Sequence, residues 1–456
     1  MSALHLSELA TMVNGHLAGD DCFVDGVSTD TRSLQQGQLF VALRGPNFDG
    51  HDYLAAAQAR GAAGALVERA AEAPLSTVEV ADSLLALGRL GQQWRQRCPA
   101  RVIAITGSNG KTTLKEMTAA ILARRGDVLA TRGNLNNAIG VPLTLSRLRQ
   151  EPFAVIELGA NHPGEIDYLT GLVKPDVAVL NNAGRAHLEG FGSLEGVARA
   201  KAEIINGLGP DGIFVFNADD RFAGLWRQLA QGRQQRTFGV AQAADVNSPA
   251  GAYSIVWRDD GFEAHFPVRC AQGEIDVRLR LAGEHNRMNA LAAIAGSLAL
   301  GAGLDDAEPA LAGLAPVAGR LCPLPGVNGA RLIDDSYNAN PDSVMAALLV
   351  LAAAPGRRTL VLGDLAELGA DAPQLHRQLG EQAAALGIDR LFTVGELSGH
   401  AAQGFPGESM HFTNRKALAE TLLRGLSEED SVLIKGSRSA RMDEVVKSCC
   451  RTEVAC

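Results

Sequence analysis

The stretch with the clearest chemistry is "RVIAITGSNGKTTLKEM", in which a β-branched apolar run gives way to a glycine-rich turn and then to a helical pattern. Gly107 and Gly110 let backbone N–H groups approach phosphate oxygens closely. Lys111 can neutralise the outer phosphates, the Thr112 hydroxyl can ligate Mg²⁺, and the helix dipole points to the same place. An incidental glycine-rich turn is the alternative, but the strand before and the helix after favour an ATP site.

Two possible metal ligands follow neighbouring predicted strands. Glu157 ends "FAVIELG", and His187 lies in "NNAGRAHLEGFG". The carboxyl ends of parallel strands face one crevice, and carboxylate oxygens with one imidazole suit Mg²⁺ or Mn²⁺. Each residue alone is weak evidence, since a lone histidine is more often a hydrogen-bonding loop residue.

Lys201 lies in "SLEGVARAKAEIINGL", where Val197, Ile204 and Leu208 share its face at helical spacing. One interpretation is a lysine that extends its ammonium group to water from the edge of an apolar stripe, which the helix alone favours. The other is a desolvated lysine of lowered pKa, whose neutral amine can react with CO₂. The resulting carbamate is an anion and a metal ligand.

Further polar groups follow later strands or begin helices. In "GEHNRMNALAAIAG", Asn286 and Asn289 can pair with an adenine edge, or can act as a helix cap and a polar surface position. Arg320 stands between two predicted domains, where an arginine can stabilise charge on a transferring phosphoryl group. Lys435 and Arg438 end the last strand, where they can receive a substrate carboxylate or form a solvated basic turn.

The elements that position these residues alternate strand and helix. The 456 residues exceed what one core usually organises. "RVIAIT", "FAVIELG", "DVAVLNNAG" and "GIFVFN" predict a mostly parallel sheet, and "ARLIDDS", "TLVLGD", "RLFTVG" and "SVLIKGS" predict another. "SIVWRDDGFEAHFPVRC" and "EIDVRLRL" predict a small antiparallel appendage. We expect an α/β protein of three domains: a small mixed domain over 1–98, a central P-loop domain over 99–313, and a C-terminal Rossmann-like domain over 314–456.

Composition narrows the partners. The formal net charge of −9 gives no electrostatic support to nucleic-acid or membrane-surface binding. No signal peptide and no bilayer-spanning stretch is found, so a cytoplasmic location is expected.

"TGSNGKTT" and "HNRMNALAA" together resemble the Mur ligases and their folylpolyglutamate synthetase relatives. This resemblance implies an ATP-dependent, amide-forming, mostly monomeric enzyme with two Mg²⁺ ions, acting through an acyl phosphate. "STDTRSLQQGQLFVALRG" resembles a UDP-binding domain that the synthetase lacks. "DDSYNANPDS", "LGDLAELG" and "KGSRSARM" favour the branch that adds D-alanyl-D-alanine to UDP-N-acetylmuramoyl-tripeptide. The sibling that adds the third residue, whose Asp-Asn-Pro-Arg motif is not found, and a P-loop ATPase of another class remain alternatives.

The resemblance also implies residue roles. The catalytic residues are expected to be Lys111, His187, Lys201 and Arg320. ATP is expected to contact Gly107, Ser108, Asn109, Gly110, Lys111, Thr112, Thr113, Asn286, Asn289, Arg320 and Asp335. The expected metal ligands are Thr112, Glu157, His187 and Lys201 as a carbamate. The expected substrate contacts are Thr31, Arg32, Asn47, Asp49, His51, Asn338, Lys435 and Arg438.

Overall fold

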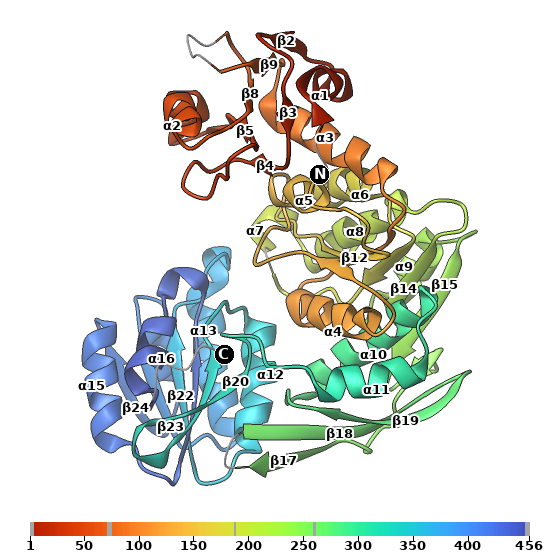
Figure 1. The fold of residues 1–456 in the computed structure, drawn as a ribbon. Coiled ribbons are helices and arrows are strands. Elements are labelled where there is room, and N and C mark those ends of the chain that lie inside the picture. The colour runs from red at the N-terminus through yellow and green to blue at the C-terminus, as the bar shows by residue number, and fades with distance from the viewer. Residues whose placement is uncertain (1–3, 71–74, 187, 259–260, 452–456) are drawn as a thin grey trace.

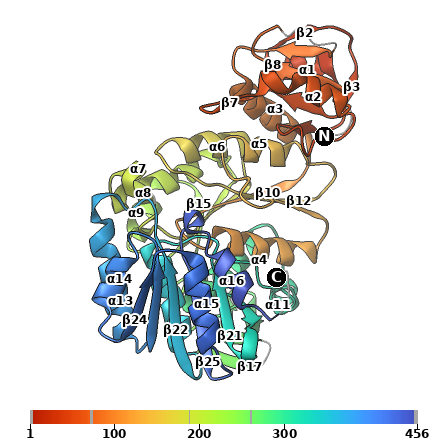
Figure 2. The same cartoon turned by 90° about the vertical axis from the view of Figure 1, so that its left-hand side faces the viewer.

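The computed structural model describes residues 4–70, 75–186, 188–258 and 261–451. It contains three main sheets with their helices, which we call the N-terminal, central and C-terminal units (Figures 1 and 2). The predicted α/β class with a mixed N-terminal part, a central mostly parallel sheet and a C-terminal parallel sheet is confirmed. The boundaries at 98/99 and 313/314 stay predictions.

The N-terminal unit is a five-stranded sheet in the order β2-β9-β8-β5-β4, parallel except for β2 against β9. The helix α3 (Ser83–Arg97) leads out of it, and its Leu87 and Trp94 share a hydrophobic cluster with Val102 and Ala104. The N-terminal and central units are therefore packed as one core. The other elements are β2 (His16–Ala18), β4 (Val27–Ser28), β5 (Leu39–Val41), β8 (Gly64–Val67), β9 (Thr77–Glu79), α1 (Leu6–Val13), α2 (Leu54–Ala59) and the short pairs β1 (Leu4–His5) with β3 (Phe23–Val24) and β6 (Arg44–Gly45) with β7 (Phe48–Asp49).

The central sheet runs β11-β12-β10-β13-β14-β15-β16-β18-β17, and β19 pairs with β18. The strands from β11 to β16 are parallel, whereas β17, β18 and β19 form the predicted antiparallel appendage and continue the same sheet. The strands are β10 (Arg101–Thr106), β11 (Val128–Ala130), β12 (Phe153–Glu157), β13 (Val177–Leu180), β14 (Ile213–Asn217), β15 (Gln234–Gly239), β16 (Val246–Asn247), β17 (Ser254–Arg258), β18 (Gly261–Cys270) and β19 (Gly273–Leu279).

Both faces of the central sheet are covered by helices, which explains why Val102 to Ile105 of β10 are all apolar. Ile103 and Ile105 on one face of β10 share a cluster with the helices α4 (Lys111–Ala123) and α10 (Glu284–Ala299). The opposite face packs on the core shared with the N-terminal unit. The remaining helices are α5 (Gly140–Leu145), α6 (Glu165–Val173), α7 (Leu188–Phe191), α8 (Leu194–Ala202), α9 (Ala223–Leu229) and α11 (Leu304–Ala312).

The C-terminal sheet runs β20-β21-β25-β22-β23-β24, and only β20 is antiparallel to its neighbour. Helices flank this sheet, and one core cluster fills each face. The elements are β20 (Cys322–Pro325), β21 (Arg331–Asp335), β22 (Arg357–Gly363), β23 (Arg390–Val394), β24 (Glu408–Phe412), β25 (Asp430–Lys435), α12 (Pro341–Ala352), α13 (Ala372–Ala385), α14 (Gly399–Gly404), α15 (Arg415–Gly425) and α16 (Asp443–Cys449). Across the described ranges, every helix is too short or too polar to cross a bilayer.

Candidate functional site

A cavity of about 1150 Å³ lies between the central and C-terminal units. Its walls include segments that follow β10, β12, β13 and β21, as expected where the carboxyl ends of parallel strands meet. The structure brings most of the predicted site residues together here, namely Ser108, Asn109, Gly110, Lys111, Thr112, Thr113, Glu157, Asn286, Asn289, Arg320, Asp335, Asn338, Lys435 and Arg438.

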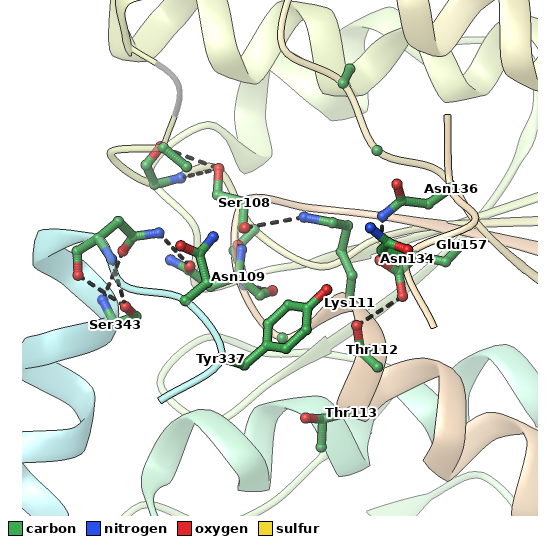
Figure 3. Close-up of a pocket in the computed structure, with 18 of the residues that line it drawn as sticks. Ser108, Asn109, Lys111, Thr112, Thr113, Asn134, Asn136, Glu157, Tyr337 and Ser343 are labelled. Carbon is green, nitrogen blue, oxygen red and sulfur yellow. Dashed lines mark hydrogen bonds between the residues drawn. The ribbon is translucent and has the colours of Figure 1, made fainter. Parts of the chain in front are cut away.

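The phosphate loop, Gly107 to Thr113, joins β10 to α4. Gly110 is the N-cap of α4 with a φ of +78°, a backbone conformation that favours glycine. The Lys111 Nζ donates to the Gly107 carbonyl oxygen at 2.7 Å and to the Ser108 carbonyl oxygen at 3.2 Å, and Figure 3 draws the second of these bonds. Burial lowers the pKa of Lys111, and the Glu157 charge opposes this shift. Since two neutral carbonyls are the hydrogen-bond partners of Lys111 among the described residues, its charge is available to an anion.

The loop is fastened to the turn that follows β13. The Asn109 N–H donates to Asn182 Oδ1 at 2.9 Å, and the amides of Asn181 and Asn182 both donate to the Asn109 carbonyl. The Ser108 hydroxyl donates to the Gly184 carbonyl at 3.1 Å and accepts from the Gly184 N–H at 2.9 Å. The role of Asn181 and Asn182 was not predicted, although two adjacent asparagines at the end of a buried strand are a signal for it.

Glu157, the last residue of β12, places its carboxylate next to the Thr112 hydroxyl of the phosphate loop (Figure 3). The Glu157 side chain is buried and accepts from Thr112 Oγ1 at 3.0 Å and from Asn136 Nδ2 at 2.8 Å. A carboxylate and a hydroxyl fit Mg²⁺ that takes its other ligands from water and phosphate. The described ranges contain no cluster of three acidic, histidine or cysteine side chains that would hold a metal by themselves. His187 lies outside the described residues. Asn136 was missed, because only the asparagine-rich sequence "NLNNAIG" marks it.

Lys201 lies at the end of α8 and is 1% exposed, so the interpretation of a lysine reaching to water is wrong. Burial lowers the pKa of Lys201 to about 7, and the positive charge of Lys111 adds to this effect. Its Nζ lies 5.3 Å from the centre of the Phe191 ring. Among the described residues it has no carboxylate within salt-bridge distance. A neutral amine at this position fits reaction with CO₂, and the carbamate stays a prediction.

Asn286 and Asn289 are each 3% exposed, so the alternative of a cap and a surface position is wrong. Asn289 accepts from Asn181 Nδ2 at 2.8 Å and donates to Asn286 Oδ1 at 3.1 Å. Both line the cavity beside His285. Burial, and then the charge of Lys435, lowers the pKa of His285 to about 4, which keeps its ring neutral at pH 7. Adenine contact stays a prediction for the two asparagines.

The C-terminal wall of the cavity carries one paired lysine and two arginines that lie against a tyrosine ring. Lys435 is 2% exposed and donates to Asp335 Oδ2 at 2.5 Å and to the Asn338 carbonyl at 3.0 Å, so the alternative of a solvated basic turn is wrong for this residue. The guanidinium groups of Arg320 and Arg438 lie 4.4 Å and 5.7 Å from the centre of the Tyr337 ring. Tyr337 reaches toward the phosphate loop (Figure 3) and was missed by the sequence analysis. The ribose role of Asp335 and the carboxylate roles of Lys435 and Arg438 stay predictions.

The predicted uridine contacts lie in the N-terminal unit, outside the lining of the cavity. His51 is buried, and its ring N–H donates to Asp49 Oδ1 at 2.6 Å, while its Nε2 accepts from the Glu68 N–H at 2.9 Å. These bonds to His51, followed by the charge of the Arg69 guanidinium, hold the pKa of Asp49 at about 2. The other predicted contacts, Thr31, Arg32 and Asn47, are more exposed. Of these, Arg32 forms an ion pair with Asp30.

Comparison with known families covers most of the chain. Residues 23–95 match the Mur ligase family catalytic domain, 105–296 the Mur ligase middle domain, and 319–438 the Mur ligase glutamate ligase domain. The UDP-N-acetylmuramoyl-tripeptide–D-alanyl-D-alanine ligase of Escherichia coli (strain K12) is 48% identical over 98% of both chains. The enzyme of that name from Bacillus subtilis (strain 168) is 37% identical over 97% of both chains.

Solved structures agree with the sequence relatives. MurF from Acinetobacter baumannii superposes with a TM-score of 0.91 at 37% identity, over 98% of this chain and 99% of that chain. MurF ligase from Thermotoga maritima in complex with ADP gives a TM-score of 0.83 at 27% identity, over 93% of this chain and 97% of that chain. With the phosphate loop, the buried carboxylate and the facing arginines gathered in one cavity, the chain belongs to the Mur ligase family.

Proposed function

We propose that this protein is an ATP-dependent ligase that joins D-alanyl-D-alanine to UDP-N-acetylmuramoyl-tripeptide, producing the pentapeptide precursor of peptidoglycan. The observation that carries the proposal is the cavity itself, in which Lys111 and Thr112 face the arginine-bearing wall of the C-terminal unit. Similarity to dipeptide-adding ligases along almost the whole chain supports this choice over the third-residue sibling and over other P-loop ATPases.

The reaction needs positioning and charge stabilisation more than covalent chemistry by the protein. A terminal carboxylate oxygen of the tripeptide attacks the γ-phosphorus of ATP, and the bond to the bridging oxygen breaks to release ADP. The amine of the dipeptide then attacks the carbonyl carbon of the acyl phosphate. Collapse of the tetrahedral intermediate releases inorganic phosphate and leaves the amide, with the amine proton lost to solvent.

Lys111 and Arg320 act on the phosphoryl group from opposite walls of the cavity. Preorganised cations at the place where negative charge develops lower the barrier, because they need no rearrangement during the reaction. Thr112 and Glu157 would hold Mg²⁺, which offsets the repulsion between a carboxylate and a polyanion. Lys201 as a carbamate, with His187, would contribute to the site of a second ion. A crystal structure without extra density on Lys201 would count against the carbamate.

The remaining assignments divide the substrates among three domains. Residues 1–98 would bind the uridine end through Thr31, Arg32, Asn47, Asp49 and His51. Residues 99–313 would bind ATP, with the adenine against Asn286 and Asn289. Residues 314–456 would hold the ATP ribose through Asp335 and receive the dipeptide through Asn338, Lys435 and Arg438. We infer a monomer working in the cytoplasm, where its small, water-soluble substrates occur; light scattering tests the first inference and cell fractionation the second.

The test is phosphate release from ATP with Mg²⁺, the UDP-linked tripeptide and the dipeptide, leaving out each in turn. We expect release to need both substrates and to yield a pentapeptide product by mass. Release with the UDP-linked dipeptide and a single diamino acid would move the protein to the sibling activity. Release that does not depend on any of these compounds would overturn the ligase assignment.

A further inference from the structure

The N-terminal end of α12 touches the phosphate loop across the cavity. Asn340 is the N-cap of this helix, and its Oδ1 accepts from the Ser343 N–H at 2.9 Å. The Nδ2 of the same side chain donates to Asn109 Oδ1 at 2.7 Å. Figure 3 shows Ser343, at the start of this helix, on the same side of the site as Asn109. One side chain therefore caps a helix of the C-terminal unit and binds the phosphate loop of the central unit.

A second contact lies beside the first. The Arg185 N–H donates to Asp342 Oδ2 at 2.7 Å, and Asp342 is in the first turn of α12. The neighbouring residue is Gly184, where an added Cβ would lie 2.8 Å from Asp342 Oδ2 and 3.4 Å from Asn109 Nδ2. A side chain at position 184 would therefore push against the Asp342 carboxylate.

We propose that Asn340 and Asp342 are positioning residues, which dock the C-terminal unit on the phosphate loop and thereby set the distance between the two walls of the site. The connecting segment explains how this docking acts on the chemistry. Tyr337 lies three residues before Asn340 and carries Arg320 and Arg438 on its ring. Fixing Asn340 to the loop fixes the ring, and the ring fixes both guanidinium groups.

The inference rests on the proposed ligase activity and goes beyond it in naming what aligns the two walls. Misplacing a reacting group by about 1 Å can cost up to about 100-fold in rate. The phosphate loop has its own anchors in Asn181, Asn182 and Gly184, so it keeps its shape when the docking contacts are lost. Loss of docking should therefore lower kcat by a larger factor than it lowers ADP affinity, because ADP would lose only the expected contact with Asp335.

Asn340→Ser and Asp342→Ala test the two contacts separately. Serine caps a helix as well as asparagine does but is too short to reach Asn109. The matched controls are Asn414→Ser, which replaces the N-cap of α15, and Asp443→Ala, which removes an acidic residue from the first turn of α16. We expect kcat to fall about tenfold or more in the two docking variants and to stay at the wild-type value in the controls.

Three readouts separate docking from folding and from the ligase assignment. The affinity for ADP by calorimetry should fall by a smaller factor than kcat does, since the phosphate loop is intact. Thermal unfolding should match the paired control, and small-angle scattering with ADP should show a more extended particle. An unchanged kcat in Asn340→Ser and Asp342→Ala, or an equal loss of ADP affinity, would overturn the proposal. If the wild-type protein does not ligate at all, the function proposal fails, and scattering with ADP still tests docking.

Discussion

The central and C-terminal units differ in how they hold the lysines at or beside the cavity. On the central side, Lys111 is bound by carbonyl oxygens only, and Lys201 has no carboxylate at salt-bridge distance among the described residues. On the C-terminal side, Lys435 is paired with Asp335. A desolvated cation without a carboxylate partner lowers stability, but its charge can still interact with an anionic ligand. The charge of a paired cation is already compensated by its partner. The lysines of the central unit therefore keep their charge for phosphate, whereas on the C-terminal wall Lys435 is already paired and Arg320 and Arg438, stacked on Tyr337, face the substrates.

The largest expected effect comes from Lys111→Ala. We expect kcat/KM for ATP to fall by about 10³-fold, because a preorganised charge at the phosphoryl group is lost. The fold should persist by circular dichroism, since the lysine binds only carbonyls of its own loop. Turnover near the wild-type value in this variant would refute the role given to the central wall.

Lys435→Met should act mainly on stability, in contrast to Lys111→Ala. It leaves the Asp335 carboxylate in a buried place without its partner, which we expect to lower the free energy of unfolding by about 3 kcal/mol. Urea unfolding measures the loss. Adding Asp335→Asn should recover most of it, because no unpaired charge then remains; a double variant as unstable as the single one would contradict the pairing argument.

The contribution of Lys201 to the free energy of unfolding should depend on pH. Its pKa of about 7 lies below the value of 10.5 for a free lysine, so between these values the unfolded chain binds the extra proton and stability rises with pH. In buffer without CO₂, the free energy of unfolding should gain about 2 to 3 kcal/mol from pH 7 to pH 9 through this group. Lys201→Met should lose this slope, while the exposed Lys447→Met keeps it. Equal slopes in all three proteins would show that Lys201 is not desolvated in solution.

The smallest effect is expected at Tyr337. Replacement by leucine removes the ring on which Arg320 and Arg438 lie, and should lower kcat about fivefold, in line with a modest cation–π energy. Tyr337→Phe keeps the ring and should stay within about twofold of wild type. If phenylalanine were as harmful as leucine, the hydroxyl and not the ring would matter.

The parts that the sequence predicted are local. The phosphate loop follows from one strand, its glycines and one helix start. The pair of Asp335 and Lys435 joins residues a hundred positions apart, so no local pattern could reveal it. The same holds for Asn136, which reaches Glu157 from a loop without a motif, and for the burial of Lys201, which depends on helices packed around it.

The antiparallel extension of the central sheet packs into the core of the C-terminal unit. Phe262 of β18 is buried in the core of the C-terminal unit with Val344 and Leu348. Trp257 of β17 packs edge-on against Phe262, with 5.3 Å between the centres of the two rings. A rigid rotation of the C-terminal unit that keeps this shared core intact would have its axis at β17 and β18, away from the start of α12. Such a rotation would change the distance between the two walls of the cavity most at the phosphate loop.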